Sequence, residues 1–338
     1  MTDPHDPHAP QGTDHPGTAA HADHGTYERP EGEPAGVTPT LSRKPSAIIL
    51  AAGRGTRMRS DLPKVVFPVG GRPMVCAVVD ACLAAGCGRV IVVVGHRQEL
   101  VREALAAYPT VEFAVQDQQL GTGHAVQSAA PLLAGEAERS GNETLVLCGD
   151  GPLIRTATID KMLRRHRSSD AAATLATAVI PDPSGYGRIV RDAKGRFAAI
   201  VEQKNCTPEQ LRITEVNPSY YCFDTKELFG ALRGVTRNEV SGEYYLTDAP
   251  GLLLNAGERV EVIEAVPPED VLSINTPEDL AKVDAVFRSR PAPTSVQAAA
   301  AAQARSATPA KPQGAPAKPQ AALAKPQGTA AKPPGAHA

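Results

Sequence analysis

Short runs of apolar, mostly β-branched residues alternate with amphipathic stretches through the first half of the chain's middle. Four runs have the length and composition of strands buried in a parallel sheet: Ala47–Ala51, Val90–Gly95, Val111–Val115 and Thr144–Cys148. Between them apolar positions recur at helical spacing, over Met74–Ala85, Glu99–Ala107 and Gly123–Leu133. This alternation predicts an α/β fold, a doubly wound and mostly parallel sheet with helices on both faces.

The following stretch, Ala171–Val266, has a less regular pattern, and Gly185-Tyr186-Gly187 has the composition of a turn into another strand. We expect this smaller, β-rich half to extend the sheet and to cover the far side of a cleft. Ligands of doubly wound sheets bind beyond the carboxyl ends of the strands, so the loops after the strands should carry the chemistry.

Proline marks the boundaries of the predicted domain. Residues 1–45 and 291–338 together hold 17 of the 31 prolines in the 338-residue chain, and both ends are poor in aromatic residues. Such segments bury too little apolar surface to offset the entropy of ordering them. We therefore expect a disordered His/Pro-rich arm over 1–45, a folded domain over 46–290, and a disordered Ala/Pro/Lys/Gln-rich tail over 291–338.

Charge and cysteine content narrow the class of protein. The formal net charge is −2, which gives no overall electrostatic attraction to nucleic acid or to an anionic membrane. No run of 18 apolar residues predicts a membrane-spanning helix, and no apolar segment after Met1 predicts a signal peptide. Six cysteines without C-x-x-C spacing indicate core thiols in a reducing compartment, so we expect a cytoplasmic protein.

The loop after the first predicted strand carries the sharpest chemical signal. It contains Gly53 and Gly55, followed by Arg57 and Lys64. A glycine-rich turn directly after a buried strand leaves backbone N–H groups free to face phosphates. The dinucleotide fingerprint is excluded because Met58 stands where its third glycine belongs, and the P-loop is excluded because Lys64 lies too far along the chain. The two cations could instead fold over a triphosphate held by the turn.

Seven segments in order resemble the uridylyltransferase half of bacterial bifunctional N-acetylglucosamine-1-phosphate uridylyltransferases, within the sugar-1-phosphate nucleotidyltransferases. The resemblance covers about residues 46–290. Its segments are Leu50–Met58 with Pro63-Lys64, Gln116–Ala125, Cys148–Asp150, Gly185–Ile189, Val201–Lys204, Gly242–Asp248 and Ser273–Asn275.

The resemblance implies a role for most of the polar residues in these segments. It implies Arg57 and Lys64 as catalytic residues that stabilise the departing pyrophosphate, and Asp150 with Asn275 as ligands of Mg²⁺, which prefers oxygen donors. The residues implied in nucleotide binding are Leu50, Ala51, Ala52, Gly53, Gln116, Gly121 and Thr122. The Gln116 amide offers a donor and an acceptor to the edge of uracil, with Gly121 allowing close approach of the backbone. We expect His124 to pack or to contact a phosphate edge rather than to transfer a proton.

Sugar binding is implied for Gly187, Glu202 and Asn217, and here the chain departs from the family pattern. Asn217-Pro218-Ser219 replaces the usual Asn-Thr-Gly, and Cys148 replaces the usual Tyr. These departures concern the sugar more than the nucleotide. A strand-edge Glu202 paired with Lys204, and an Asn275 that caps the helix from Pro277, remain alternatives.

The implied reaction transfers UMP from UTP to N-acetylglucosamine 1-phosphate and releases pyrophosphate, with Mg²⁺ as cofactor and without a nucleophilic side chain. The acetyltransferase β-helix of the bifunctional relatives has no counterpart after Arg290, so we expect no acetyltransferase activity. One alternative is the same chemistry on another sugar 1-phosphate, such as glucose 1-phosphate, or on another nucleotide. Two further alternatives are a nucleotide-sugar-binding regulator without turnover and a scaffold that acts through its tails. The oligomeric state is not predicted.

Overall fold

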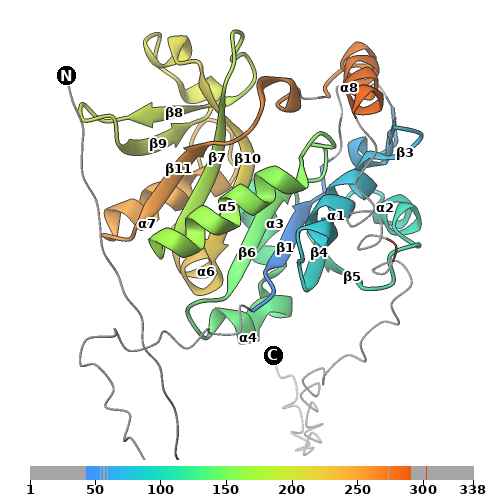
Figure 1. The fold of residues 1–338 in the computed structure, drawn as a ribbon, viewed down its shortest axis with the longest axis horizontal. Coiled ribbons are helices and arrows are strands. Elements are labelled where there is room, and N and C mark those ends of the chain that lie inside the picture. The colour runs from blue at the N-terminus through green and yellow to red at the C-terminus, as the bar shows by residue number, and fades with distance from the viewer. Residues whose placement is uncertain are drawn as a thin grey trace, which may run out of the picture. The chain divides into compact units, whose positions relative to one another are not determined.

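The computed structural model describes residues 43–290 except Arg54, Thr56, Arg57, Arg59 and Ser273, together with the single residue Ala302. The two ends that we expect to be disordered therefore lie outside the described residues, apart from residues 43–45 and Ala302. Arg57 also lies outside them. Within the described part a nine-stranded sheet has its main strands in the order β11-β7-β10-β6-β1-β4-β5 (Figure 1).

The first half of the sheet follows the predicted alternation of strands and helices. Its strands pair in parallel, β6 with β1, β1 with β4 and β4 with β5. They are β1 (Ser46–Leu50), β4 (Arg89–Val94), β5 (Val111–Val115) and β6 (Glu143–Cys148). The intervening helices are α1 (Met74–Ala84), α2 (Gln98–Ala104), α3 (Thr122–Ser128) and α4 (Ala134–Ala137). The predicted stretch Gly123–Leu133 is broken after α3 and continues as a 3-10 turn, Ala130–Leu133, with Pro131 near its start.

The second half extends this sheet, as expected, but not in parallel throughout. β10 (Glu215–Asp224) lies antiparallel between β6 and β7 (Ala173–Val179), and β11 (Val260–Glu264) adds to β7 in parallel. A hairpin of β8 (Gly187–Arg191) and β9 (Phe197–Val201) branches from β10. The helices of this half are α5 (Thr156–Ser169), α6 (Thr225–Leu232) and α7 (Ala249–Asn255). These features confirm the α/β class predicted from the sequence, with helices on both faces of the sheet.

Two apolar cores lie on opposite faces of the sheet. On one face α1, α2 and α5 pack against the sheet, with Val79, Val101 and Met162 fully buried. On the other face α3, α6 and α7 contribute Val126, Leu228 and Leu253. Figure 1 shows α5 crossing one face of the strands. Helices on both faces leave the strand ends as the accessible part of the sheet.

A third, smaller cluster attaches helix α8 (Pro277–Ser289) to the loops beyond β1 and β6. It contains Met58, Leu153 and Val283, together with residues near the short hairpin of β2 (Pro68–Val69) and β3 (Arg72–Pro73). Nearby, the 2 % exposed Asp270 forms ion pairs with Arg155 and Arg290. These contacts bring the segment that contains Asn275 to the carboxyl-end side of the sheet.

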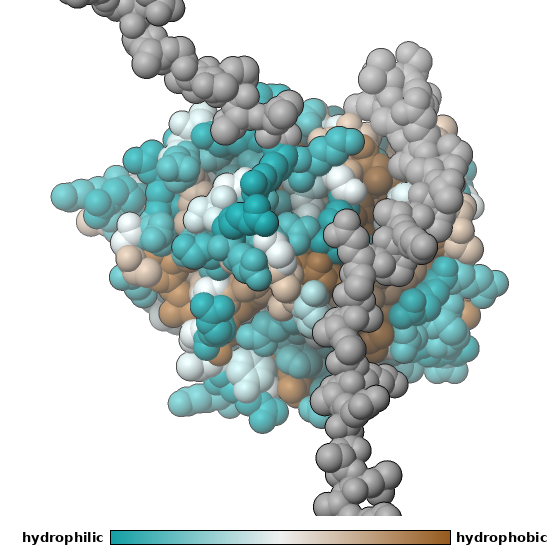
Figure 2. Space-filling model, turned by 90° about the horizontal axis from the view of Figure 1, so that it is seen from below, coloured by the Kyte–Doolittle hydropathy of each residue, from teal (hydrophilic) through white to brown (hydrophobic). Residues whose placement is uncertain are grey.

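No helix in the described residues is long and apolar enough to cross a membrane. On the face shown in Figure 2, hydrophilic surface is interrupted by scattered apolar areas. The large hydrophobic side chains that are exposed in the described part come from separate elements: Leu62, Val115, Val179, Leu211, Val240 and Leu272. The six cysteines are all unpaired thiols, as predicted, and four of them are buried.

Candidate active site

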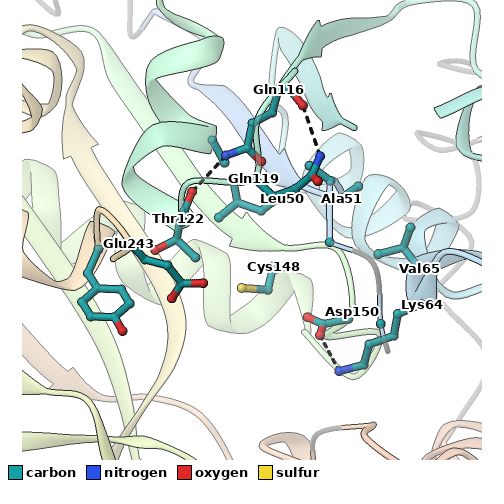
Figure 3. A pocket seen from close by; sticks show the side chains of 16 residues that line it. Leu50, Ala51, Lys64, Val65, Gln116, Gln119, Thr122, Cys148, Asp150 and Glu243 are labelled. Atoms are coloured by element: carbon teal, nitrogen blue, oxygen red, sulfur yellow. Dashed lines mark hydrogen bonds and ion pairs between the residues drawn. The ribbon is translucent and has the colours of Figure 1, made fainter. Parts of the chain in front are cut away.

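A cavity of about 360 Å³ opens where β1, β5 and β6 end. All seven predicted nucleotide-binding residues line it, together with Lys64 and Asp150 (Figure 3). The full lining is Leu50, Ala51, Ala52, Gly53, Gly55, Lys64, Val65, Gln116, Gln119, Gly121, Thr122, Ala125, Cys148, Asp150, Glu243 and Tyr245. The position beyond the carboxyl ends of parallel strands is the one at which doubly wound sheets bind ligands.

Lys64 begins a short 3-10 turn, Lys64–Val66, directly after Pro63. Its backbone packs against the glycine-rich loop, because a Cβ placed on Gly55 would lie 2.8 Å from the Cβ of Lys64. Gly55 also has a φ of +62°, a conformation that glycine adopts without strain. Gly55 and Lys64 are thus in direct contact just beyond the carboxyl end of β1.

The ammonium group of Lys64 forms an ion pair with Asp150, whose Oδ2 lies 2.7 Å from Nζ. Lys64 is largely buried, while about a third of the Asp150 side chain is exposed. Asp150 follows β6, so two predicted functional residues from separate loops meet at one end of the cavity, as Figure 3 shows. The carboxylate therefore already faces a cation in the protein alone.

Gln116 lies at the other end of the cavity, directly after β5, and only 3 % of it is exposed. Its backbone N–H donates to the carbonyl of Val94, which fixes it to the neighbouring strand end. Its side-chain Nε2 donates to the Gly121 carbonyl at 3.0 Å and lies 3.0 Å from Nδ1 of His124. His124 thus contacts a predicted base-reading residue.

Gly121 can be nothing but glycine in this loop. Its φ is +105°, and a Cβ would lie 2.5 Å from the carbonyl oxygen of Tyr244. The same Tyr244 backbone exchanges hydrogen bonds with Leu120 and Gly123, and the hydroxyl of Thr122 accepts from the N–H of Leu246. The loop that carries Gly121 is therefore paired with the segment 243–246, which also brings Glu243 and Tyr245 to the cavity.

Cys148 lies between Glu243 and the Lys64–Asp150 pair in the view of Figure 3. Burial raises the pKa of its thiol to about 12, so it is a neutral thiol at physiological pH. The Ser219 side chain lies close enough to this thiol and to the Tyr221 hydroxyl to lower the pKa of both groups, against the larger effect of burial. The two departures from the family pattern, Cys148 and Ser219, are thus neighbours in the structure.

Ser219 has a φ of +65°, in the left-handed region that favours glycine. It sits in an irregular part of β10, where the register with β7 shifts between Val216 and Tyr220. The backbone N–H of Ser219 donates to Oδ1 of Asn217 at 3.2 Å. This backbone contact holds Ser219 in a local turn, at the position where the family pattern expected from the sequence has glycine.

The predicted sugar-binding residues form a second group that does not line the cavity. Gly187 and Asn217 are partners in the pairing of β8 with β10, and the Asn217 side chain donates to the Tyr221 hydroxyl at 2.6 Å. The hydroxyl of Thr247 donates to Glu202 at 3.1 Å. Burial raises the pKa of Glu202, and its charge in turn contributes to the raised pKa of Cys148. Glu202 therefore lies near the Cys148 side of the cavity.

Lys204 pairs with Glu243 at 3.7 Å and lies over the ring of Tyr245, 5.1 Å from its centroid. The ion pair of Lys204 is thus not the Glu202–Lys204 pair that the sequence left open, although the charge of Lys204 acts against the rise in the pKa of Glu202. Because Glu243 and Tyr245 line the cavity, Lys204 connects the two groups of residues.

Asn275 does not cap α8. The cap is Thr276, whose hydroxyl accepts from Asp279 in a capping box. The Asn275 backbone N–H donates to the Asp279 carboxylate at 3.0 Å. The capping alternative for its side chain is therefore removed, and a role as a metal ligand stays a prediction.

The sequence did not single out Glu243 and Gln119 as site residues. Glu243 belongs to one of the seven recognised segments, but the backbone pairing of the adjacent Tyr244 with the Gly121 loop brings it to the cavity. Tyr245 is 7 % exposed and also lines the cavity. Pairing between distant loops leaves no local pattern in a sequence.

Comparison with known proteins agrees with this architecture. Residues 47–234 match the MobA-like NTP transferase domain. Over 245 residues the chain is 44 % identical to the bifunctional protein GlmU of Pelotomaculum thermopropionicum, and over 244 residues it is 44 % identical to that of Bacillus cereus. Each alignment covers 72 % of this chain and 52 % of the relative, so the chain matches about half the length of these proteins.

Solved structures share the fold at low sequence identity. A putative glucose-1-phosphate thymidylyltransferase from Bacillus anthracis has a TM-score of 0.60 at 18 % identity, covering 74 % of this chain and 98 % of that one. A UDP-glucose pyrophosphorylase solved with UDP-glucose has a TM-score of 0.57 at 16 % identity, covering 73 % and 100 %. The family match, the GlmU relatives and the cavity at the strand ends agree: the chain belongs to the MobA-like NTP transferase family and is a nucleotidyltransferase.

Proposed function

We propose that this protein transfers UMP from UTP to N-acetylglucosamine 1-phosphate, giving UDP-N-acetylglucosamine and pyrophosphate. The observation that carries the proposal is the joint lining of one cavity by the glycine loop after β1, Lys64, Asp150 and the Gln116–Thr122 loop. This set offers backbone donors for phosphates, a cation, a carboxylate and a base-sized polar edge. The 44 % identity to GlmU proteins supports the same nucleotide and sugar.

Nucleotide binding is assigned to the strand-end loops. Gly53 and its neighbours present backbone N–H groups to the phosphates, and Gln116 with Gly121 contacts the base. Gln116 suits this role because a buried polar side chain discriminates strongly between bases: a wrong base leaves it unpaired.

Enzymes of this family generally use a divalent metal, and the residues present fit Mg²⁺. Asp150 and Asn275 are oxygen donors, and the Asp150 carboxylate already holds a cation, the Lys64 ammonium, at 2.7 Å. A bound metal would be held by Asp150 and Asn275 and would supply neutralisation of phosphate charge. Lys64 would then be released from Asp150 to contact phosphate.

In the proposed reaction an oxygen of the sugar phosphate forms a bond to the α-phosphorus of UTP. The bond from the α-phosphorus to the bridging oxygen breaks, and pyrophosphate leaves with the electron pair. The attacking phosphate is already ionised, so no general base is required. Lys64 stabilises the charge that moves onto pyrophosphate; we assign the same role to Arg57, which lies outside the described residues. Catalysis then consists of positioning and charge stabilisation.

Sugar binding is assigned to Gly187, Glu202 and Asn217, on the Cys148 side of the cavity. The raised pKa of Glu202 and its hydrogen bond from Thr247 fit a partly desolvated carboxylate that accepts from sugar hydroxyls. Because Cys148 and Ser219 reshape this neighbourhood, glucose 1-phosphate is retained as a second candidate substrate.

The test is product formation by purified protein with Mg²⁺ across pairs of nucleoside triphosphate and sugar 1-phosphate. UDP-N-acetylglucosamine should form at least about tenfold faster than any other product, because a missing polar contact lowers kcat/KM by that order. Faster product formation with glucose 1-phosphate would support the proposed reaction but assign it a different sugar substrate. No product with any pair would contradict the proposal.

A further inference from the structure

The side chain of Gln116 is held in one orientation by two partners behind it, neither of which is a phosphate or a metal. Nε2 lies 3.0 Å from the Gly121 carbonyl oxygen and 3.0 Å from Nδ1 of His124. A carbonyl oxygen can only accept a hydrogen bond, so the atom facing Gly121 must be the amide nitrogen. The flipped amide would bring two oxygens together and lose that bond.

His124 takes the second hydrogen of the same amide. An amide NH₂ carries two hydrogens, and with one donated to Gly121 the other points to Nδ1. For Nδ1 to accept it, the ring proton must be on Nε2. A proton on Nδ1 would face an N–H donor at 3.0 Å, so this tautomer and the amide orientation require each other.

Both amide hydrogens are donated to Gly121 and His124. The carbonyl oxygen Oε1 is therefore the atom that the amide offers to a base. Among the described residues, this oxygen accepts no hydrogen bond. An acceptor fits the N3–H of uracil and opposes cytosine, which has a lone pair at N3. The sequence expected Gln116 to serve as donor and acceptor; the structure leaves it the acceptor role.

We propose that His124 is a positioning residue that sets base selectivity by holding the Gln116 amide with its carbonyl toward the base. His124 is half-buried, comes from the first turn of α3 and does not line the cavity, so it acts through Gln116. The inference rests on the proposed use of UTP and extends it to the residue that makes the site reject CTP.

The chain offers closely matched variants for a test. H124L removes the ring acceptor, while H124N places an amide oxygen near the position of Nδ1 and keeps it. S128A is the control, because Ser128 lies one turn further along α3 and its hydroxyl donates to the backbone carbonyl of His124, not to the ring. Thermal unfolding of each variant establishes that it is folded.

The readout is the ratio of the dissociation constants of CTP and UTP, measured by calorimetry with Mg²⁺ and without sugar phosphate. We expect the wild type and S128A to share one high ratio, H124L to lower it about tenfold, and H124N to keep it within about threefold. KM for the sugar phosphate should stay unchanged in all of them. An unchanged ratio in H124L, or equal binding of UTP and CTP by the wild type, would overturn the inference.

A second measurement needs no variant. The ¹⁵N chemical shifts of the His124 ring in the wild-type protein report which nitrogen carries the proton, and we expect Nε2. A proton on Nδ1 would overturn the inference. The binding ratio also separates this inference from the proposed function, because UTP preference without turnover contradicts only the function, whereas UTP turnover with an unchanged ratio in H124L contradicts only the role of His124.

Discussion

Lys64 Nζ lies 2.7 Å from Asp150 Oδ2, so the predicted catalytic cation and the predicted metal-ligating carboxylate neutralise each other in the protein alone. The two residues are separated by the whole of α1, β4, α2, β5 and α3, and they meet because β1 and β6 are neighbours in the sheet. A site whose opposite charges are already paired has little net charge to desolvate. Binding of metal and triphosphate would exchange this pair for two stronger contacts.

Replacement of Asp150 by Asn should separate metal binding from folding. The amide keeps a polar contact to Lys64 but loses the charge that a metal requires, so the Mg²⁺ concentration for half-maximal rate should rise at least about tenfold. About a third of the Asp150 side chain is exposed and the amide oxygen can still accept from Lys64, so the free energy of unfolding without metal should change by less than about 1 kcal/mol. Metal titration of pyrophosphate release and chemical denaturation measure the two quantities. An unaltered metal requirement would remove Asp150 from the metal site.

Replacement of Gly121 by Ala should damage both the fold and nucleotide use. The added Cβ would meet the Tyr244 carbonyl oxygen at 2.5 Å, at a φ of +105° that alanine avoids. We expect a loss of about 2–3 kcal/mol of stability and at least about 100-fold in kcat/KM for UTP. Gly251→Ala is the matched control, because it lies in α7 with open space around it and should be neutral or stabilising by up to about 1 kcal/mol. Equal behaviour of the two variants would contradict the close packing of the loops.

At position 219 a glycine variant should be more stable than an alanine variant, which is the reverse of the usual order within a strand. Within a strand, Gly is normally less stable than Ala by about 0.5–1 kcal/mol. The left-handed φ of +65° penalises any Cβ by about 1–2 kcal/mol, so Ser219→Gly should be more stable than Ser219→Ala by about 1 kcal/mol. Both variants lack the serine hydroxyl, so the difference between them isolates the backbone. Thermal denaturation of the pair decides the matter, and a more stable alanine variant would contradict the backbone conformation.

The raised pKa of Glu202 has consequences for both activity and stability as pH changes. Burial raises the pKa above 4.5, so acid protonates this carboxyl earlier than an ordinary glutamate. The acid limb of kcat/KM for the sugar phosphate should therefore lie above pH 4.5 and disappear in Glu202→Gln, whose activity should be uniformly low.

The direction in which Glu202 changes the stability of the fold with pH follows from its proton uptake. A group with a raised pKa in the folded state favours folding most at pH values below its unfolded pKa, and this contribution is lost as pH rises through the folded pKa. The stability of Glu202→Gln relative to the wild type should thus increase from below pH 4.5 to neutral pH. A difference that falls over this range would show that the carboxyl is not desolvated.

The parallel half of the fold could be predicted because its strands are continuous apolar runs, as with Val111–Val115, which matched to the residue. The antiparallel placement of β10 between β6 and β7 could not, because strand order depends on which edges meet in space. In the site, Lys64, Asp150 and Gln116 followed from their places after strands and from the resemblance. Glu243 and the His124–Gln116 contact depend on side chains and loops brought together by tertiary packing, which no spacing reveals.

The central claim is that the cavity holding Lys64 and Asp150 carries out uridylyl transfer. Its most direct test is the rate of pyrophosphate release with UTP, N-acetylglucosamine 1-phosphate and Mg²⁺, in wild type, Lys64→Ala and Lys161→Ala. Lys161 is an exposed lysine on α5 and serves as the control. We predict rapid release by the wild type and Lys161→Ala, and a loss of at least about 100-fold in Lys64→Ala with its fold intact. No release by the wild type, or near-full turnover by Lys64→Ala, would contradict the account.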